Sequence, residues 1–287
     1  MSSIIQLFMP KFQFFRRKIM KKRFLLFGLC FSAVLNAAAV TAAPDAAAPA
    51  STLFQVSTVF ALEEGVFDGD YSYRDLMKKG DLGLGTFNGI DGELVAVDGK
   101  FYQTTPECRL IPVSPDLKSP FAEIIPFQPT IFGTVSNSSD YHDLGQKLLA
   151  MFPNPNTPYA IRLDGEFSSV KFRSLTKVTP PFPNLLEASK KQAVKEMKNV
   201  KGTAVGFWFP QYWEGVGMPI FHLHFATEDR QFGGHVLAIS VANAKVQLQS
   251  VQNIQIYLPN TKEFSQAHIE DTHSIQKNLN KTELSSH

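Results

Sequence analysis

The stretch IFHLHFATEDRQFGGHV, residues 220–236, predicts two neighbouring antiparallel strands. Residues 220–227 form a short apolar run with histidines at alternating positions, which is typical of a β-strand. The polar residues 227–231 and the pair Gly233–Gly234 can form a loop that folds the next strand back beside the first. The stretch therefore indicates an antiparallel sheet in the second half of the chain.

The three histidines of this stretch form a candidate metal site. Residues i and i+2 of a strand point to the same face, so His222 and His224 project together, about 7 Å apart. His235 enters the same neighbourhood when the second strand folds back. Three neutral imidazoles leave a coordination position open, as in catalytic metal sites. The alternative is a set of isolated histidines on an ordinary hairpin, which is the usual case for a lone histidine.

The composition is that of a globular protein rich in β-structure. The 287 residues are 44% hydrophobic and 19% charged, which excludes disorder of the whole chain and suffices for one large or two smaller domains. Many short apolar runs, together with 25 Phe, 18 Gly and 18 Pro, favour a β-rich or mixed fold over a helical bundle. A net charge of +2 is too small to indicate a nucleic-acid partner.

Residues 1–43 are predicted to be a leader that directs export. Three basic residues at 21–23 precede an apolar core at 24–35 and a small-residue cleavage region at 37–43, the pattern of a secretory signal peptide. Met20, just before this pattern, is a candidate for the true start. We therefore expect a periplasmic or secreted protein without stable membrane association once the leader is cleaved.

Two other interpretations of the leader stay open. An uncleaved membrane anchor is the weaker one, because the apolar run is short for a bilayer and is interrupted at Asn36. Arg16–Arg17 imperfectly match a twin-arginine export signal.

Since Cys30 lies in the leader, the mature chain keeps only Cys108 and is expected to form no intrachain disulfide.

The remainder is predicted to be α+β and β-rich, in two domains. Residues 44–51 are a flexible spacer. Residues 52–157 are expected to form an N-terminal mixed sheet with helices. Residues 158–259 are expected to form an antiparallel, barrel-like domain that carries the histidines, followed by a polar tail at 260–287.

Several individual elements are legible in the sequence. Residues 53–62 predict a strand that runs into a short helix, and residues 93–103 a hairpin around an Asp-Gly turn. Amphipathic helices are predicted at 139–152 and at 184–200.

Three segments in this order carry a resemblance to a known family. They are GDLGLGTFNGIDGE (80–93), VKFR (170–173) and HLHF…GGH (222–235). Together they resemble the alpha-acetolactate decarboxylase family, and the likeness runs from about residue 53 to residue 259. The resemblance implies a mixed-sheet domain, a barrel-like domain, zinc between them, and a homodimer.

The resemblance implies decarboxylation of the small molecule (S)-2-acetolactate to (R)-acetoin and CO2. When CO2 leaves, its bonding electrons need a sink, and the neighbouring ketone becomes an enediolate. A metal chelated by the hydroxyl and ketone oxygens stabilises that charge without pyridoxal or thiamine. The family likeness places the zinc ligands on His222, His224 and His235, in agreement with their spacing.

The resemblance assigns further roles to Glu93, Arg173 and Thr86. Glu93 begins an arm that is apolar on both faces, and burial raises the pKa of a carboxyl group, which suits the general acid that protonates the enediolate. Arg173 would orient the substrate carboxylate, and Thr86 would contact the substrate. The alternatives are a rim glutamate, a surface salt bridge and ordinary turn chemistry.

A fourth zinc ligand is expected from the tail. Glu283 is the best match to the family's tail glutamate, and Glu270 is its competitor. Imidazoles and a carboxylate also suit manganese, iron, cobalt or copper.

Two other function classes stay open. One is an exported, non-catalytic zinc-binding protein, which would need the histidines but not Glu93 and Arg173. The other is a cupin-type metal oxygenase or isomerase, whose motif partly resembles HLHFATE, residues 222–228.

Overall fold

The computed structural model describes residues 52–269 and 272–283. The expected leader at 1–43 and the spacer at 44–51 lie outside these ranges, so export stays a prediction. Within the described ranges, no helix is long and apolar enough to cross a membrane. Cys108, the cysteine in these ranges, is a buried free thiol.

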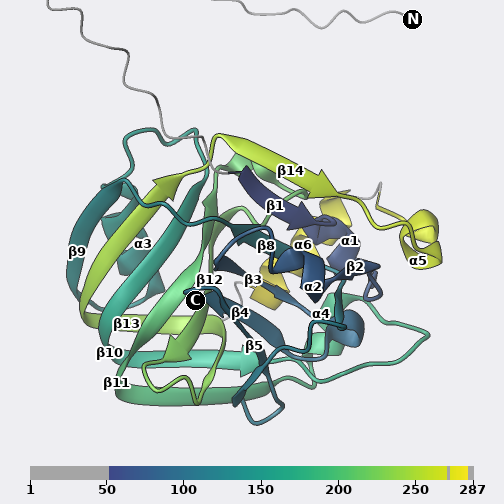
Figure 1. Ribbon diagram of the computed structural model, residues 1–287, viewed down its shortest axis with the longest axis horizontal. Coiled ribbons are helices and arrows are strands. Elements are labelled where there is room, and N and C mark those ends of the chain that lie inside the picture. Colours follow the sequence, from purple (N-terminus) through teal and green to yellow (C-terminus); the bar gives the residue numbers. More distant parts are fainter. Residues whose placement is uncertain (1–51, 270–271, 284–287) are drawn as a thin grey trace, which may run out of the picture. The chain divides into compact units, whose positions relative to one another are not determined.

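Two sheets dominate the structure, and the predicted α+β, β-rich class is confirmed (Figure 1). The first sheet has seven strands in the order β14-β1-β8-β3-β4-β5-β6, and the second has five in the order β10-β11-β12-β13-β9. A two-stranded ribbon, β2-β7, accompanies them. The strands are β1 Thr52–Val56, β2 Tyr71–Ser72, β3 Leu82–Thr86, β4 Glu93–Val97, β5 Lys100–Thr104, β6 Leu110–Pro112, β7 Lys118–Ser119, β8 Ala122–Ile125, β9 Ile131–Ser138, β10 Tyr159–Ser174, β11 Ala193–Phe209, β12 Ile220–Thr227, β13 Gly233–Ser250 and β14 Asn253–Tyr257.

The helices are short except for the last. They are α1 Val59–Glu63, α2 Tyr73–Leu76, η1 Asn88–Ile90, α3 Tyr141–Leu149, α4 Leu185–Ser189, η2 Gln211–Trp213, α5 Lys262–Gln266 and α6 Thr272–Glu283. The last of these, α6, packs against α1 and α4.

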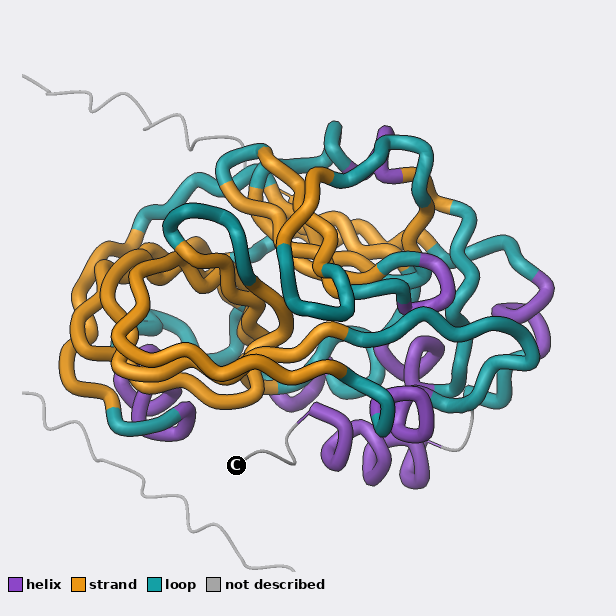
Figure 2. The backbone as a smooth tube through the Cα atoms, turned by 90° about the horizontal axis from the view of Figure 1, so that it is seen from below, coloured by secondary structure: helices purple, strands orange, loops and turns teal. Residues whose placement is uncertain are grey.

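The second sheet closes on itself, which confirms the barrel-like expectation. β10 pairs with β11 along one edge and with β13 along the other, and β12 bridges β11 and β13. Figure 2 shows these long strands as a ring seen nearly end-on. β9 continues the sheet beyond β13.

The two sheets exchange segments across the expected domain boundary at 157/158. β9 belongs to the first half of the chain but pairs with β13 of the barrel. β14 follows the barrel strands but pairs in parallel with β1 of the seven-stranded sheet. The chain thus crosses between the sheets more than once, and the boundary itself stays a prediction.

The helix predicted at 184–200 is wrong over most of its length. Only Leu185–Ser189 is helical, and residues 193–200 belong to β11. Their Lys, Glu and Met residues favour helix locally. However, β10 offers a partner along its whole length, from Ser174 opposite Ala193 to Tyr159 opposite Trp208. Pairing with a neighbouring strand therefore overrides local propensity.

Other predicted elements are confirmed. The amphipathic helix at 139–152 is α3, capped by Asp140, whose side chain accepts from the backbone N–H of Asp143. The hairpin at 93–103 is the β4–β5 pair. The strand and short helix at 53–62 are β1 and α1.

The alternation of side chains on β12 decides where the histidines point. Phe221, Leu223 and Phe225 belong to the apolar core of the barrel, whereas Ala226 packs in the core shared with the seven-stranded sheet. Since alternate residues of a strand face opposite sides, His222 and His224 point out of the barrel, toward the seven-stranded sheet. In agreement, β3 and β4 pack against strands β11, β12 and β13.

The same face of the seven-stranded sheet also buries an acidic residue that is not part of the histidine cluster. Glu123 on β8 is completely buried, opposite Gln55 on β1 and Leu84 on β3. Burial raises the pKa of its carboxyl group from 4.5 to about 8, because a low-dielectric environment disfavours the charged form. Glu123 is therefore mostly protonated in the folded protein at neutral pH.

We predict that Glu123→Gln stabilises the protein more strongly as the pH rises. The pKa of Glu123 is higher in the folded than in the unfolded protein. The contribution of this group to the free energy of unfolding of the wild type therefore decreases as pH rises from about 4.5 to about 8. At pH 7 the loss amounts to roughly 3 kcal/mol, and glutamine avoids it. Urea unfolding at pH 5 and pH 8 measures the difference. A gain no larger at pH 8 than that of the exposed Glu228→Gln would contradict the prediction.

Candidate metal and substrate site

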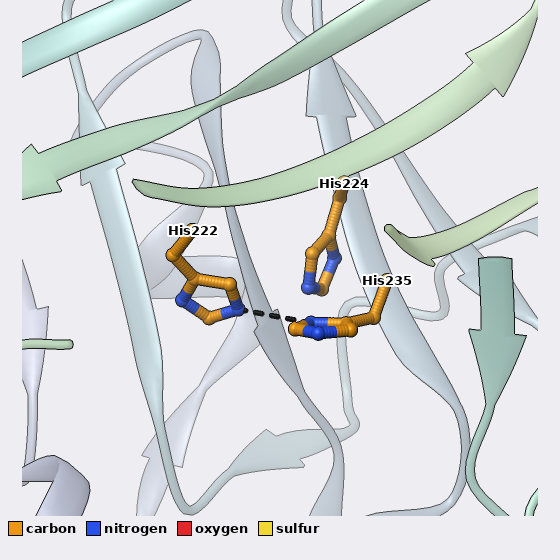
Figure 3. Close-up of side chains that lie close together, drawn as sticks. All are labelled: His222, His224 and His235. Carbon is orange, nitrogen blue, oxygen red and sulfur yellow. Dashed lines mark hydrogen bonds between the residues drawn. The ribbon is translucent and has the colours of Figure 1, made fainter. Parts of the chain in front are cut away.

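His222, His224 and His235 converge as the sequence predicts. All three side chains are buried, and each offers a nitrogen atom within 4.8 Å of the others. Figure 3 shows the three rings turned toward one another, with a hydrogen bond of 3.1 Å between His222 Nε2 and His235 Nδ1. Two nitrogen ligands of a tetrahedral ion at 2.0–2.1 Å lie about 3.3–3.4 Å apart. The His222–His235 separation is close to this value, and the histidine cluster is placed to hold a metal ion.

The backbone of β4 fixes the tautomer of His224. His224 Nδ1 lies 2.6 Å from the carbonyl oxygen of Leu94. A carbonyl oxygen can only accept a hydrogen bond, so Nδ1 carries the proton and Nε2 of the neutral ring carries the lone pair. Hydrogen bonds of this kind orient metal-binding imidazoles in proteins. His224 is thus prepared to bind a metal through Nε2.

Three polar side chains lie in one row across the seven-stranded sheet. Thr86 on β3 pairs with Glu93 at the start of β4. The β4–β5 register, which pairs Leu94 with Gln103, continues to Thr104 beside Glu93, and the backbone N–H of Glu93 donates to Thr104 Oγ1 at 2.7 Å. Directly paired residues project from the same face of a sheet. This face is the one that packs against the barrel, as Leu84 and Val95 in the shared core show.

A second row lies on the barrel and faces the first. Arg173 on β10 pairs with His235 on β13, and His235 pairs with His224 on β12. Arg173 Nε lies 3.5 Å from Glu93 Oε1, and His224 Nε2 lies 3.9 Å from Glu93 Oε2. Glu93 therefore stands between the guanidinium and the histidine cluster, buried as expected.

The end of α6 reaches the same place. Arg173 Nη1 donates to the backbone carbonyl of Thr282 at 3.0 Å and to Gln192 Oε1 at 3.3 Å. The tail therefore contacts the site through the backbone carbonyl group of Thr282. Glu283 is the last residue of α6, and its side chain lies outside the description, as does the whole of Glu270. The tail ligand accordingly stays a prediction.

Two glycines allow the close approach of strands at the site. Gly92 has φ +86°, and a Cβ there would lie 2.1 Å from the carbonyl oxygen of Thr104. A Cβ on Gly234 would lie 2.1 Å from the carbonyl oxygen of Arg173. Gly233 and Gly234 begin β13 instead of forming the predicted loop. They let His235 lie beside Arg173, and Gly92 lets Glu93 lie beside Thr104.

A small cavity joins the two rows. Its volume is about 30 Å³, and its polar lining is Thr86, Glu93, Arg173 and the histidine cluster. Leu62 of α1, Leu185 of α4 and three further apolar or small residues, Gly85, Phe121 and Leu175, complete it. The space suits an ion or a few water molecules.

The hydroxyl groups that support the site are not predicted from the sequence. Thr104 Oγ1 accepts from the backbone N–H of Glu93 at 2.7 Å and bonds Ser174 Oγ at 2.7 Å. Tyr73 and Ser119 both donate to the carbonyl oxygen of Thr86, at 2.8 Å each. The predicted hairpin could have revealed Thr104, since its register places Thr104 opposite Glu93.

A larger cavity lies elsewhere and has different chemistry. It measures about 450 Å³ and is lined by charged residues of the barrel strands and the β12–β13 turn. Lys201 pairs with Glu166 there at 3.3 Å, and Arg230 Nη1 donates to Thr203 Oγ1 at 3.1 Å. It shares no lining residue with the histidine cavity. Despite its size, it lacks the convergence of imidazoles and carboxylate that the small cavity has.

We predict that zinc stabilises the protein through the histidine cluster. At a free zinc concentration 100 times the Kd, binding adds about 2.7 kcal/mol to the free energy of unfolding. His224→Ala removes a ligand and should abolish most of this gain. His142→Ala, which changes an exposed histidine on α3, should keep it. Thermal unfolding with and without zinc measures both, and an undiminished gain in His224→Ala would contradict the assignment.

Comparison with known proteins gives one consistent result. The family model described as alpha-acetolactate decarboxylase matches residues 53–271. The alpha-acetolactate decarboxylase of Brevibacillus brevis is 43% identical over 218 residues, 76% of each chain. That of Bacillus subtilis strain 168 is 36% identical over 235 residues, 82% of this chain and 92% of the relative. A crystal structure of the Bacillus subtilis protein matches with a TM-score of 0.78 at 35% identity, covering 81% of this chain and 99% of the other. The matched residues include both rows of polar side chains.

Proposed function

The chain belongs to the alpha-acetolactate decarboxylase family, and from this premise we propose that it converts (S)-2-acetolactate to (R)-acetoin and CO2 with zinc. As a member of this family it is an enzyme, a carboxy-lyase. One observation supports the assignment of this reaction to the small cavity. A carboxyl group, a guanidinium and three imidazoles from two sheets meet in one buried cavity.

His222, His224 and His235 would hold the zinc ion, which would act as a Lewis acid toward acetolactate. Three neutral imidazoles leave room for substrate atoms beside them. The hydrogen bond from His224 to Leu94 keeps one ring in the required orientation. The donor set supports zinc, and it supports related divalent metals as well.

Arg173 would bind and orient the substrate carboxylate. Its side chain is only 2% exposed, so its charge acts in an environment of low dielectric constant, where an ion pair is stronger than in water. The contacts with Thr282 and Gln192 limit its motion. A carboxylate held in this way is placed next to the histidine cluster until CO2 leaves.

Glu93 would deliver the proton that replaces CO2. Burial favours the protonated form of a carboxyl group, and the neighbouring Arg173 favours the ionised form. A carboxyl group between these two influences can hold a proton and release it to the substrate carbon. The fixed position of Glu93 on one side of the cavity would give a single product configuration, (R)-acetoin.

Thr86 would contact the substrate as a hydrogen-bond acceptor. Its hydroxyl already donates to the carbonyl oxygen of Gly92 at 2.7 Å. The remaining lone pairs of Oγ1 can accept a hydrogen bond from a substrate hydroxyl group. This polarity would help to distinguish a hydroxy acid from an analogue without the hydroxyl.

Three further features are part of the proposal. Glu283 would be the fourth zinc ligand, supported by the position of its neighbour Thr282 beside Arg173. The leader at 1–43 would direct export, and two copies of the chain would form a homodimer.

The family membership disfavours the cupin-type alternative. A measurement of turnover distinguishes the proposed enzyme from the non-catalytic zinc-binding alternative.

We predict that the purified chain beginning at Pro44 releases acetoin and CO2 from racemic acetolactate. Chelation should abolish turnover, and added zinc should restore it. Glu93→Gln should lower kcat by about 10²- to 10⁴-fold, because it removes the proton donor, while zinc content is unchanged.

Glu107→Gln is the matched control, because Glu107 is exposed on the β5–β6 loop. It should retain wild-type turnover. A zinc-loaded wild-type protein without turnover would support the binding-protein alternative, and unchanged turnover in Glu93→Gln would contradict the role of that residue.

A further inference from the structure

Thr104 and Ser174 form a buried pair of hydroxyl groups next to the site. Thr104 ends β5 of the seven-stranded sheet, and Ser174 ends β10 of the barrel. Their oxygen atoms are 2.7 Å apart, and the residues are 2% and 0% exposed. The hydrogen bond therefore joins the two sheets in the interior of the protein.

The surrounding contacts indicate the direction of this hydrogen bond. Thr104 Oγ1 already accepts from the backbone N–H of Glu93. Ser174 Oγ can donate to the carbonyl oxygen of Leu175, at 3.4 Å. When Thr104 donates to Ser174, the Glu93 N–H, the Thr104 hydroxyl and the Ser174 hydroxyl each have an acceptor. Successive hydrogen bonds of this kind polarise and strengthen one another.

The pair is placed where the relative position of the sheets matters most. Glu93 and Arg173 come from different sheets, and their side chains lie 3.5 Å apart. Thr104 Oγ1 accepts a hydrogen bond from the backbone N–H of Glu93, while Ser174 follows Arg173 in the chain. A displacement of about 1 Å at reacting groups can lower a rate by roughly 100-fold. The hydroxyl pair opposes such a displacement.

We propose that Thr104 and Ser174 are positioning residues that fix Glu93 against Arg173 across the two sheets and thereby set the rate of the reaction. They do not line the small cavity, so they act through their neighbours. The effect on rate rests on the proposed decarboxylase function. The effect on the geometry of Glu93 and Arg173 does not.

Thr104→Val tests the proposal, because valine keeps the shape and removes the hydroxyl. We expect kcat to fall by roughly 10- to 100-fold, with a smaller change in KM and with zinc content unchanged. Thr104→Ser restores a hydroxyl and should recover most of the rate. Thr105→Val is the matched control, since the Thr105 hydroxyl bonds Glu107 outside the site. An unchanged kcat in Thr104→Val would overturn the proposal.

A double-mutant comparison separates positioning from stability. If Thr104 acts through Glu93, Thr104→Val should cause little further loss in a Glu93→Gln background. A full additional loss there would show that Thr104 supports the fold generally and would overturn the positioning role.

A measurement without substrate separates this proposal from the proposed function. In NMR spectra of the zinc-loaded protein, Thr104→Val should accelerate hydrogen exchange of the Glu93 amide and shift the Arg173 Nε–H resonance, whereas Thr105→Val should change neither. Unaltered signals in Thr104→Val would overturn the positioning role. These changes in a protein whose wild type lacks turnover would leave the positioning intact and refute the decarboxylase function.

Discussion

The hydrogen bond from His224 Nδ1 to the carbonyl oxygen of Leu94 links the two halves of the site. It joins the barrel to the seven-stranded sheet and determines which nitrogen of His224 can bind a metal. Leu94 follows Glu93 in β4, so the same strand that orients the imidazole also supplies the carboxyl group. The relative position of the histidine cluster and Glu93 therefore depends on how these two sheets pack.

The site lies in an apolar interface, which makes its polar groups costly to leave unsatisfied. Leu84, Val95 and Val205 belong to the core that surrounds it. A buried polar group destabilises the fold unless it has a hydrogen-bond or ion partner. The Glu93–Arg173 pair, the Thr104–Ser174 bond and a bound cation would each supply such partners. Stability and catalysis thus require the same contacts here, and a substitution that separates the sheets affects both.

The sequence predicts the histidine cluster well because local rules suffice. Alternation places His222 and His224 on one face of a strand, and a short turn returns His235 to their side. The spacing does not reveal that this face points out of the barrel, because both faces of β12 are buried. The approach of Glu93 and Arg173 depends on contacts between distant segments, and for their roles the family resemblance guides the prediction; the contact of the Thr282 carbonyl with Arg173 is not predicted.

The wrong helix at 184–200 has a similar cause. Its residues favour a helix when considered alone. They form part of β11 because they pair with β10, a strand that precedes them in the chain. The parallel pairing of β14, at the edge of the seven-stranded sheet, with its neighbour β1 is likewise not predictable, since parallel pairing of distant strands leaves no local pattern. Local periodicity is sufficient to predict elements such as α3.

The proposed function requires that one metal ion binds where the two rows of polar side chains meet. Anomalous diffraction at the zinc absorption edge, from crystals of the zinc-loaded protein, tests it most directly. We expect one strong peak per chain, about 2.0–2.1 Å from a nitrogen of each of His222, His224 and His235. A peak at another place, or none at these three imidazoles, would contradict it.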